Sequence, residues 1–357
     1  MKKRALAIFD RLRVKLHEVS IRVGLRVVYF RYIQKWVLLG VIIGIMGGLG
    51  TAIFYWLLDL STIFFLNIIP TNLGSSWVMV LIPALGGLIA GPIIYLLAPE
   101  AEGHGTDAVI SAYHKHWGSI RARVPIIKTL ASSITIGSGG SAGKEGPIAQ
   151  IGAGFGSLLG KILNLSPRER RIAVAVGIGA GIGSIFKAPF GGALLASEIL
   201  YLRDFEPEVL PPAFIATMIG YLIFGYFNCW KPIFYTPSFR GEQYIFHDPL
   251  SLLLFSILGV LCGVFGVIYV KTFYGIKALF DKLKIPRIFK PAIGGFLVGL
   301  IGMYYPYILE SGYGWLQMLI QGNMDILPIT IIILLPFLKI IATSLSISSG
   351  GSGGVFA

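Results

Sequence analysis

Ile136-Gly-Ser-Gly-Gly-Ser-Ala-Gly-Lys-Glu-Gly-Pro147 is a glycine-rich turn that leads into an apolar stretch of helical length. A turn of this kind at a helix N-terminus presents unpaired backbone N–H groups, which together form a binding site for an anion. The pattern returns near the other end of the chain, where residues 339–354 align without a gap on residues 128–143. Two copies of one anion-cradling turn predict a single anion path built by an internal duplication.

The composition assigns the chain to a lipid bilayer. Hydrophobic residues make up 55% of it and charged residues 13%. With a mean hydropathy of +0.77, it is too apolar for a soluble domain with a hydrated surface. Shorter, glycine-interrupted apolar stretches predict half-helices around a buried polar site. Six longer segments approach or exceed the ~20 residues that span a bilayer: residues 36–66, 77–97, 209–227, 252–270, 291–304 and 326–345.

The basic residues occur in blocks beside the apolar segments. A net charge of +13 would also suit a nucleic-acid partner, but this arrangement follows the positive-inside rule and predicts no nucleic-acid binding. Residues 1–35 are expected to form a cytoplasmic, basic, amphipathic helix rather than a signal peptide, because charges interrupt their apolar residues. The blocks at residues 161–171 and 271–290 are expected on the same cytoplasmic side.

The duplication extends beyond the glycine turn. Repeats of this kind place the site of many transporters near the bilayer midplane. Three further pairs of similar stretches follow one another in the same order, at residues 39–44 and 258–263, 83–91 and 291–299, and 103–105 and 312–314.

This pattern predicts two membrane repeats. The second repeat is expected to be incomplete, because the first continues to about Phe227 after its glycine turn, whereas Ala357 closely follows the second turn. The expected organisation is the cytoplasmic segment 1–35, a first membrane repeat at 36–230, an inter-repeat linker at 231–249 and a second membrane repeat at 250–357.

The order of these motifs resembles the CLC family of chloride channels and chloride/proton antiporters. Gly143-Lys-Glu-Gly-Pro147 is similar to the family's G-[KR]-E-G-P element, and Gly354-Val-Phe-Ala357 to the start of its second-half G-x-F-x-P element. Residues 99–107 lie where the family has its G-S-G-x-P anion motif, and Phe186-Lys-Ala-Pro189 followed by Glu198 fits the region after it. The resemblance extends from about residue 36 to the end of the chain.

This resemblance implies an all-α polytopic membrane protein with two inverted structural repeats, whose broken helices meet at a central anion site. It also implies a multi-pass homodimer in the cell membrane, with one pore per subunit, chloride as the transported ligand and no cofactor. No arrangement of nucleophile, base or paired carboxylates in the sequence supports catalysis, so the chain is not expected to be an enzyme.

Glu145 is the candidate gate. It lies at the first turn of a helix expected to run from Glu145 to Leu165, where the helix dipole and free N–H groups stabilise negative charge. First-turn acidic residues are common, but the resemblance implies a tethered anion that competes with chloride and leaves when it is protonated or displaced. The anion-binding residues that the resemblance implies are Gly103, His104, Gly105, Gly139, Gly140, Ser141, Gly143, Lys144, Gly146, Val355 and Phe356.

Not every glycine near this motif is expected to face an ion. Gly152, Gly156 and Gly160 are expected to allow close helix packing. A phosphate-binding Walker A loop is disfavoured, because Ser138 replaces its first glycine and Glu145 its Ser/Thr. The denser cluster before Glu145 is different, since consecutive glycines bring N–H groups close to an ion. Chloride needs such donors, without a full positive charge, for fast conduction.

Two positions depart from the family's pattern. His104 stands where a serine hydroxyl usually faces the anion. Its ring either bonds to nearby backbone or directs an N–H at chloride, in which case protonation near pH ~6.5 would strengthen binding. Ile199 stands where many antiporters carry the inner proton acceptor, so strict proton coupling is not expected. Glu198 has either a structural role, beside Arg203 or at the dimer contact, or serves as a displaced proton relay.

The remaining histidines and the cysteines predict no metal or redox site. His114 and His116, with Asp107, follow no tight ligand spacing and are expected on a polar helix face. Cys229 and Cys262 lie in apolar surroundings, which fits neither a disulfide framework nor a cysteine metal site.

The sequence therefore predicts selective chloride transport, channel-like or weakly coupled to protons, with Glu145 as the gate. A chloride/proton antiporter and a transporter of another small anion, such as nitrate or fluoride, stay open because of Ile199 and His104. A non-conducting membrane subunit, whose glycines only pack helices, is the alternative from a different class.

Overall fold

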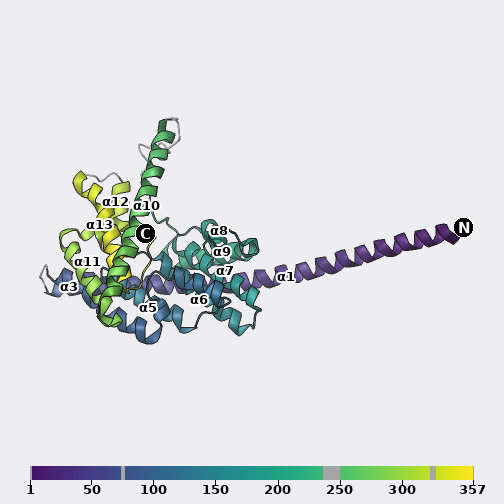
Figure 1. The fold of residues 1–357 in the computed structure, drawn as a ribbon, viewed down its shortest axis with the longest axis horizontal. Helices are drawn as coiled ribbons and strands as arrows, with labels where there is room; N and C mark the ends of the chain where they lie inside the picture. Colours follow the sequence, from purple (N-terminus) through teal and green to yellow (C-terminus); the bar gives the residue numbers. More distant parts are fainter. Residues whose placement is uncertain (1, 74–76, 236–249, 322–326, 357) are drawn as a thin grey trace.

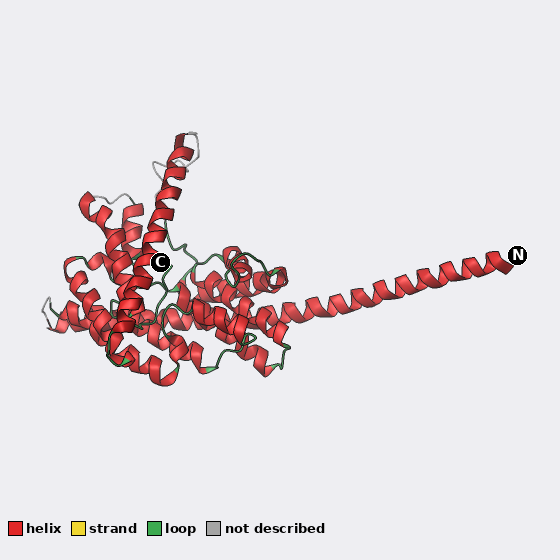
Figure 2. Ribbon diagram, viewed as in Figure 1, coloured by secondary structure: helices red, strands yellow, loops and turns green. Residues whose placement is uncertain are grey.

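The protein is almost entirely helical, as the computed structural model shows for residues 2–73, 77–235, 250–321 and 327–356. Of residues 2–31 only the backbone is described. No β-strand occurs in these ranges, and short 3-10 and π turns extend or join the helices (Figure 2). The α-helices are α1 (Lys2–Thr62), α2 (Ile69–Leu73), α3 (Val78–Pro92), α4 (Thr106–Lys115), α5 (Arg123–Gly137), α6 (Glu145–Ile162), α7 (Pro167–Ile185), α8 (Pro189–Glu198), α9 (Leu210–Asn228), α10 (Leu250–Lys282), α11 (Lys290–Tyr304), α12 (Tyr313–Ile320) and α13 (Ile329–Ser348).

The six predicted spans are confirmed as helices long and apolar enough to cross a bilayer. Between them lie shorter helices such as α4, α8 and α12, which match the half-helices predicted from the interrupted apolar stretches. The helix expected from Glu145 is also present and ends at Ile162. The spans are Tyr32–Asn72, Val78–Leu97, Pro207–Asn228, Leu250–Lys282, Arg287–Tyr304 and Ile329–Ser348.

Helix α1 connects the basic N-terminal segment to the membrane spans without a break. Its first half projects from the other helices as a single long helix (Figure 1). The predicted boundary at residue 35 falls within this continuous helix. The side chains that would test the amphipathic pattern, those of residues 2–31, lie outside the described part, and so do residues 236–249 of the predicted linker.

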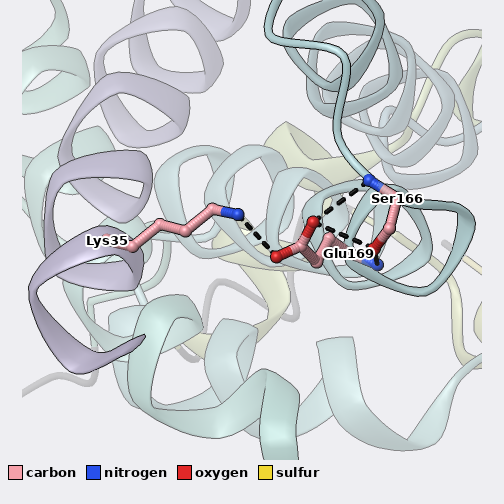
Figure 3. A network of polar contacts seen from close by, with 3 residues as sticks. All are labelled: Lys35, Ser166 and Glu169. Atoms are coloured by element: carbon pink, nitrogen blue, oxygen red, sulfur yellow. Dashed lines mark hydrogen bonds and ion pairs between the residues drawn. The ribbon is translucent and has the colours of Figure 1, made fainter. Parts of the chain in front are cut away.

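A salt bridge holds α1 where it joins the other helices. The Lys35 ammonium donates to Glu169 over 2.5 Å, between α1 and the first turn of α7 (Figure 3). Glu169 also accepts from the backbone N–H of Ser166 at 3.0 Å, while the Ser166 hydroxyl accepts from the Glu169 N–H at 3.4 Å. This reciprocal cap satisfies two N–H groups at the start of α7 and keeps the carboxylate beside Lys35.

Glycines let the central helices of the first half approach closely. A Cβ on Gly152 of α6 would lie 2.1 Å from the carbonyl oxygen of Gly177 on α7, and one on Gly177 would lie 2.2 Å from the Gly152 oxygen. Gly156 and Gly160 face the same helix. Helix α7 is buried all round from Ile172 to Ile185. The geometry thus supports the packing role expected for Gly152, Gly156 and Gly160.

The two halves pack against each other through equivalent helices. α3 and α11 carry the repeated Pro-Ala-x-Gly-Gly stretch and lie in contact there. A Cβ on Gly87 would lie 2.2 Å from the Pro291 carbonyl oxygen, and one on the equivalent Gly295 would lie 2.1 Å from the Pro83 oxygen. Each helix thus places its glycine against the proline of the other, as expected for repeats related by a two-fold axis. The predicted inverted repeats are confirmed.

Helix α10 differs from the other spans in its surroundings. In the first half, α1 packs against α5, α6, α7 and α9. Among the described residues, α10 contacts chiefly α13, and it buries only Phe273 and Phe280. Its first part projects from the body of the protein (Figure 1), and most of its apolar side chains between residues 250 and 270 are exposed.

The contact between α3 and α11 generates a stability prediction. Gly87→Ala is expected to destabilise the protein by about 1–3 kcal/mol, because its methyl group would overlap the Pro291 carbonyl. The matched control is Gly259→Ala on α10, where a Cβ meets nothing within 4 Å and alanine favours the helix. Thermal unfolding in detergent measures both variants, and equal melting temperatures would contradict the close packing.

Candidate functional site

Two glycine turns meet at the centre of the protein. The Gly143 N–H donates to the Gly354 carbonyl at 2.8 Å, and the Gly354 N–H donates to the Gly143 carbonyl at 2.7 Å. The two residues occupy equivalent positions in the aligned stretches 128–143 and 339–354. A residue that pairs with its own counterpart lies on the axis that relates two repeats, so this pair marks the two-fold axis of the fold.

Each repeat also inserts a loop into the glycine turn of the other. Gly103 bonds through its N–H and its carbonyl to residues 350–353 of the second repeat, at 2.9 and 3.3 Å. Glu310 bonds in the same two ways to residues 139–142 of the first repeat, at 3.5 and 3.3 Å. The four bonds hold the two turns beside each other.

These contacts correct one detail of the predicted repeat. The sequence pairs residues 103–105 with residues 312–314, whereas the contacts make Gly103 equivalent to Glu310, two positions earlier. The backbone agrees, because both residues adopt the left-handed region, with φ of 71° at Gly103 and 54° at Glu310. The repeats share a backbone conformation at this position and not a residue type, so similarity between residues does not reveal it.

Two lysines hold these loops, and neither was predicted from the sequence. Lys128 on α5, which is fully buried, donates to two carbonyls of the first loop, those of Ala101 and Gly103, at 3.0 and 2.7 Å. Lys339 on α13 donates to the two equivalent carbonyls of the second loop, at 2.8 and 2.5 Å. The ammonium groups thus satisfy carbonyl oxygens of both loops, while the Gly103 and Glu310 N–H groups donate to the opposite turns. The sequence signal for both lysines was a positively charged residue at the start of each aligned stretch, within an otherwise apolar helix.

Hydroxyl groups link each turn to the helix that precedes the other turn. Ser132 pairs with Ser352 at 2.8 Å, and at the equivalent place Ser141 pairs with Thr343 at 3.0 Å. The Ser141 N–H donates to the Ser346 hydroxyl at 2.9 Å. Predicted anion donors are therefore already bonded within the protein at four positions: Gly139, Gly140, Ser141 and Gly143.

The first turn of α6 keeps free donors. Glu145 and Gly146 are its first two residues, and their N–H groups have no acceptor within the helix. Gly146 packs against the loop of His104, since a Cβ on Gly146 would lie 1.9 Å from the His104 carbonyl oxygen. The structure thus brings together two predicted site segments that are about forty residues apart in the sequence.

The Glu145 side chain is buried where the two turns meet, with 3% of its surface exposed. Its Oε1 accepts a hydrogen bond from the Tyr313 hydroxyl at 2.5 Å. Its Oε2 has no partner among the described residues and lies beside Gly354, where a Cβ would be 2.7 Å away. Val355 and Phe356 continue from this point, half-buried and exposed. A buried carboxylate with an unpaired oxygen is costly.

Tyr313 is a site residue that was not predicted from the sequence. Gly312-Tyr-Gly314 is recognisable in the sequence as part of the repeat but not as part of the site. The hydrogen bond from Tyr313 to Glu145 joins residues 168 positions apart in the chain. The available signal was the tyrosine hydroxyl between two glycines, since such a group needs a partner when it is buried.

A cavity of about 350 Å³ opens on the Glu145 side. Lys144, Glu145, Tyr55, Tyr313 and Lys187 are among its walls. The Lys144 ammonium lies 4.6 Å from the centre of the Tyr55 ring and 5.8 Å from that of Tyr313. Within the described residues Lys144 forms no ion pair, so its charge adds to the potential of the cavity.

A second cavity, of about 380 Å³, opens on the other side. Gly103, His104 and Gly105 form part of its wall, together with the basic side chains of Lys277 and Arg287. Glu100, Glu102, Asp107 and Asp281 also line it, so acidic and basic side chains are mixed around this cavity.

The His104 ring bonds to its neighbours in the chain. Its Nδ1 lies 2.5 Å from the Thr106 hydroxyl and its Nε2 3.0 Å from an Asp107 carboxylate oxygen. Both ring nitrogens are therefore engaged by neighbouring side chains, and not by backbone as one of the two interpretations had it. Burial lowers the pKa of His104 below its usual value, so the ring is neutral at pH 7.

The predicted proton-pathway residues lie apart from both cavities. Glu198 ends α8, is exposed, and lines a separate open depression with Arg203. No ion pair joins Glu198 to Arg203 in the described part of the chain. Ile199 is half-buried and packs against the apolar core. The His114 ring donates to the Leu200 carbonyl, 2.7 Å away, and no cluster of three metal ligands occurs among the described residues.

Comparison with known proteins agrees with this architecture. The family described as voltage gated chloride channel matches residues 86–357. An uncharacterised protein of Methanocaldococcus jannaschii is 33% identical over 330 residues, which cover 91% of this chain and 76% of that protein. The voltage-gated ClC-type chloride channel ClcB of Shigella flexneri is 28% identical over 290 residues, which cover 80% of this chain and 66% of that protein.

A solved structure shares the fold. The structure of a slow cyanobacterial Cl⁻/H⁺ antiporter superposes with a TM-score of 0.73 at 21% identity, over 92% of this chain and 76% of that chain. The family match spans both glycine turns, the two loops that cross between them and Glu145. On this evidence the chain belongs to the voltage gated chloride channel family.

Proposed function

We propose that this protein transports chloride across the membrane along a path between its two cavities, with Glu145 as the gate. The position of the Glu145 carboxylate supports this most strongly. It is buried, accepts a hydrogen bond from Tyr313, and forms part of the wall of the first cavity, which Lys144 also lines. The next residue, Gly146, touches the loop of His104 in the wall of the second cavity.

Chloride on this path would exchange its hydration shell for backbone N–H groups at helix N-termini and loops. These donors carry only partial charge, so they bind an anion without the long residence that a contacting ammonium would impose. Lys128 and Lys339 add positive potential, but their ammonium groups contact carbonyl oxygens. The proposed donors are His104, Gly105, Glu145, Gly146, Val355 and Phe356.

The Glu145 carboxylate acts as a tethered anion in this proposal. It occupies the place of a chloride ion at the first turn of α6, where the helix dipole favours negative charge. Protonation removes its charge, and an arriving chloride ion competes with it for the same donors. Only the hydrogen bond from Tyr313 has to break among the described side-chain contacts of Glu145.

Channel-like or weakly coupled transport ranks above strict antiport, because Ile199 carries no proton and Glu198 is exposed and away from both cavities. Transport is proposed to take place in the cell membrane, in a homodimer whose N-termini lie in the cytoplasm. The alternatives are a chloride/proton antiporter and a carrier of another small anion, such as nitrate or fluoride.

Glu145→Gln tests the gate. A neutral amide at this position is expected to abolish the pH dependence of chloride flux while flux itself continues, because glutamine neither ionises nor competes as an anion. Simultaneous chloride and proton flux from liposomes, with a potassium ionophore clamping the voltage, measures this. An unchanged pH response would contradict the gate.

The same flux assay separates the alternatives. Chloride efflux without uphill proton movement identifies a channel-like conductor, and proton pumping by a chloride gradient identifies an antiporter. Loss of that pumping in Glu198→Gln would identify Glu198 as its proton relay. Replacing chloride by nitrate or fluoride tests anion choice. A chloride-independent melting temperature would favour the non-conducting subunit, since a bound ligand stabilises the folded state.

Tyr313→Phe tests the hydrogen bond to the gate. The loss of a donor to a charged oxygen costs about 1.5–3 kcal/mol, so the Glu145 carboxylate is held less firmly and the pH midpoint of flux is expected to rise. Tyr307→Phe is the matched control, because Tyr307 stacks edge-on against Trp315 and phenylalanine keeps that contact. Equal midpoints in the two variants would show that Tyr313 does not hold the gate.

His104→Ser tests the role of the histidine charge. Because burial lowers the pKa of His104 from its usual 6.5, its charge appears only below about pH 6.5. Chloride affinity, measured by calorimetry, is therefore expected to follow the same pH dependence in both proteins from about pH 9 to about pH 7, and to rise in the unmodified protein alone under more acidic conditions. A histidine-dependent rise already near pH 8 would contradict this.

A further inference from the structure

Glu310 breaks the symmetry of the two repeats. Its counterpart is Gly103, and both residues form the loop that crosses into the opposite glycine turn. Glycine adopts the left-handed backbone of this position without strain, whereas Glu310 adopts it, with φ of 54°, against the preference of a residue with a Cβ. A strained acidic residue beside the site calls for a physical reason other than folding.

The Glu310 carboxylate is poorly satisfied. Its Oε1 is buried and has no hydrogen-bond partner among the described residues. Burial raises the pKa of Glu310 above its usual value. The Lys339 ammonium next to it is already engaged by the carbonyls of Ile308 and Glu310. The carboxylate therefore has no ion-pair partner among the described residues.

The charged groups that face Glu310 converge on Lys144. The Ala142 N–H, two residues before Lys144, donates to the Glu310 carbonyl at 3.3 Å, and the charges of Asp59, Glu310 and Glu145 favour the charged form of Lys144. Lys144 forms no ion pair within the described residues and lies against the Tyr55 and Tyr313 rings instead. The titratable and charged groups around Glu310, from every element near it, are Asp59 on α1, Lys144 and Glu145 at the start of α6, Tyr313 on α12 and Lys339 on α13.

We propose that Glu310 is a second titratable carboxylate of the anion path, which acts through Lys144 to set the pH at which Glu145 leaves its site. Glu310 is not among the walls of either cavity, so it tunes the gate and does not contact the ion. This inference rests on the proposed function of Glu145 as the gate.

The direction of the effect follows from charge. While Glu310 is ionised, its negative charge offsets part of the field that Lys144 exerts on the Glu145 carboxylate, so Glu145 is held less firmly in its site. Once Glu310 is protonated, the positive charge of Lys144 acts only on Glu145 and on an arriving anion. The pair thus makes gating respond to acid over a wider pH range than a single carboxylate would.

Glu310→Gln and Glu310→Gly test this together. Both remove the charge, and only glycine also removes the backbone strain. Two pH midpoints are measured: that of chloride flux, and that of the rise in melting temperature that chloride causes. Both midpoints are expected to fall by at least about half a unit in both variants. The melting temperature of Glu310→Gly is expected to equal or exceed that of the unmodified protein. The test therefore stays valid even if Glu310→Gln folds poorly. Glu208→Gln, at an exposed ion pair with Arg168, is the control with an unchanged midpoint.

Each outcome decides the question. A lower midpoint in both variants supports the proposal. A shift in Glu310→Gly alone would assign it to the backbone and overturn the role of the charge. An unchanged midpoint in both, with the unmodified protein stabilised by chloride, would overturn the role of Glu310 and leave Glu145 as the gate. No stabilisation of the unmodified protein by chloride at any pH would overturn the proposed function and this inference with it.

Discussion

The reciprocal hydrogen bonds between Gly143 and Gly354 are the contact on which the rest of the structure depends. The pair lies on the two-fold axis, so one backbone pattern has to serve both repeats. It also has to do so without side chains, because a Cβ on Gly354 would lie 3.0 Å from the Gly143 oxygen and 2.7 Å from the Glu145 carboxylate. Fixing this pair brings the first turn of α6 and the residues after Gly354 to one point.

Polar groups around this pair are divided between holding the turns together and facing an ion. Lys128 and Lys339 satisfy carbonyls of their own repeats, and the paired hydroxyls link the repeats. The N–H groups of Glu145 and Gly146 are left over, because a helix cannot satisfy its own first turn. The N–H groups that the packing of the repeats leaves unbonded therefore form a site for a weakly held anion.

Several features could be predicted because they depend on local patterns. Apolar runs indicated the six spans, and the turn before Glu145 indicated the start of α6. Tyr313 and Lys128 could not be found in this way, because their importance comes from bonds to distant backbone or side-chain atoms. The equivalence of Gly103 with Glu310 could not be predicted either. The two residues share a left-handed backbone and a pattern of hydrogen bonds, whereas their residue types differ.

The sequence by itself determined that this chain is a duplicated, membrane-spanning helical protein with two glycine turns and an acidic residue at a helix start, since hydropathy, spacing and glycine content are local properties. Only the tertiary structure decided which N–H groups stay free. Gly139, Gly140, Ser141 and Gly143 look like anion donors in the sequence, yet they are bonded within the protein. A donor is available only when no acceptor lies nearby, and that depends on how distant segments pack.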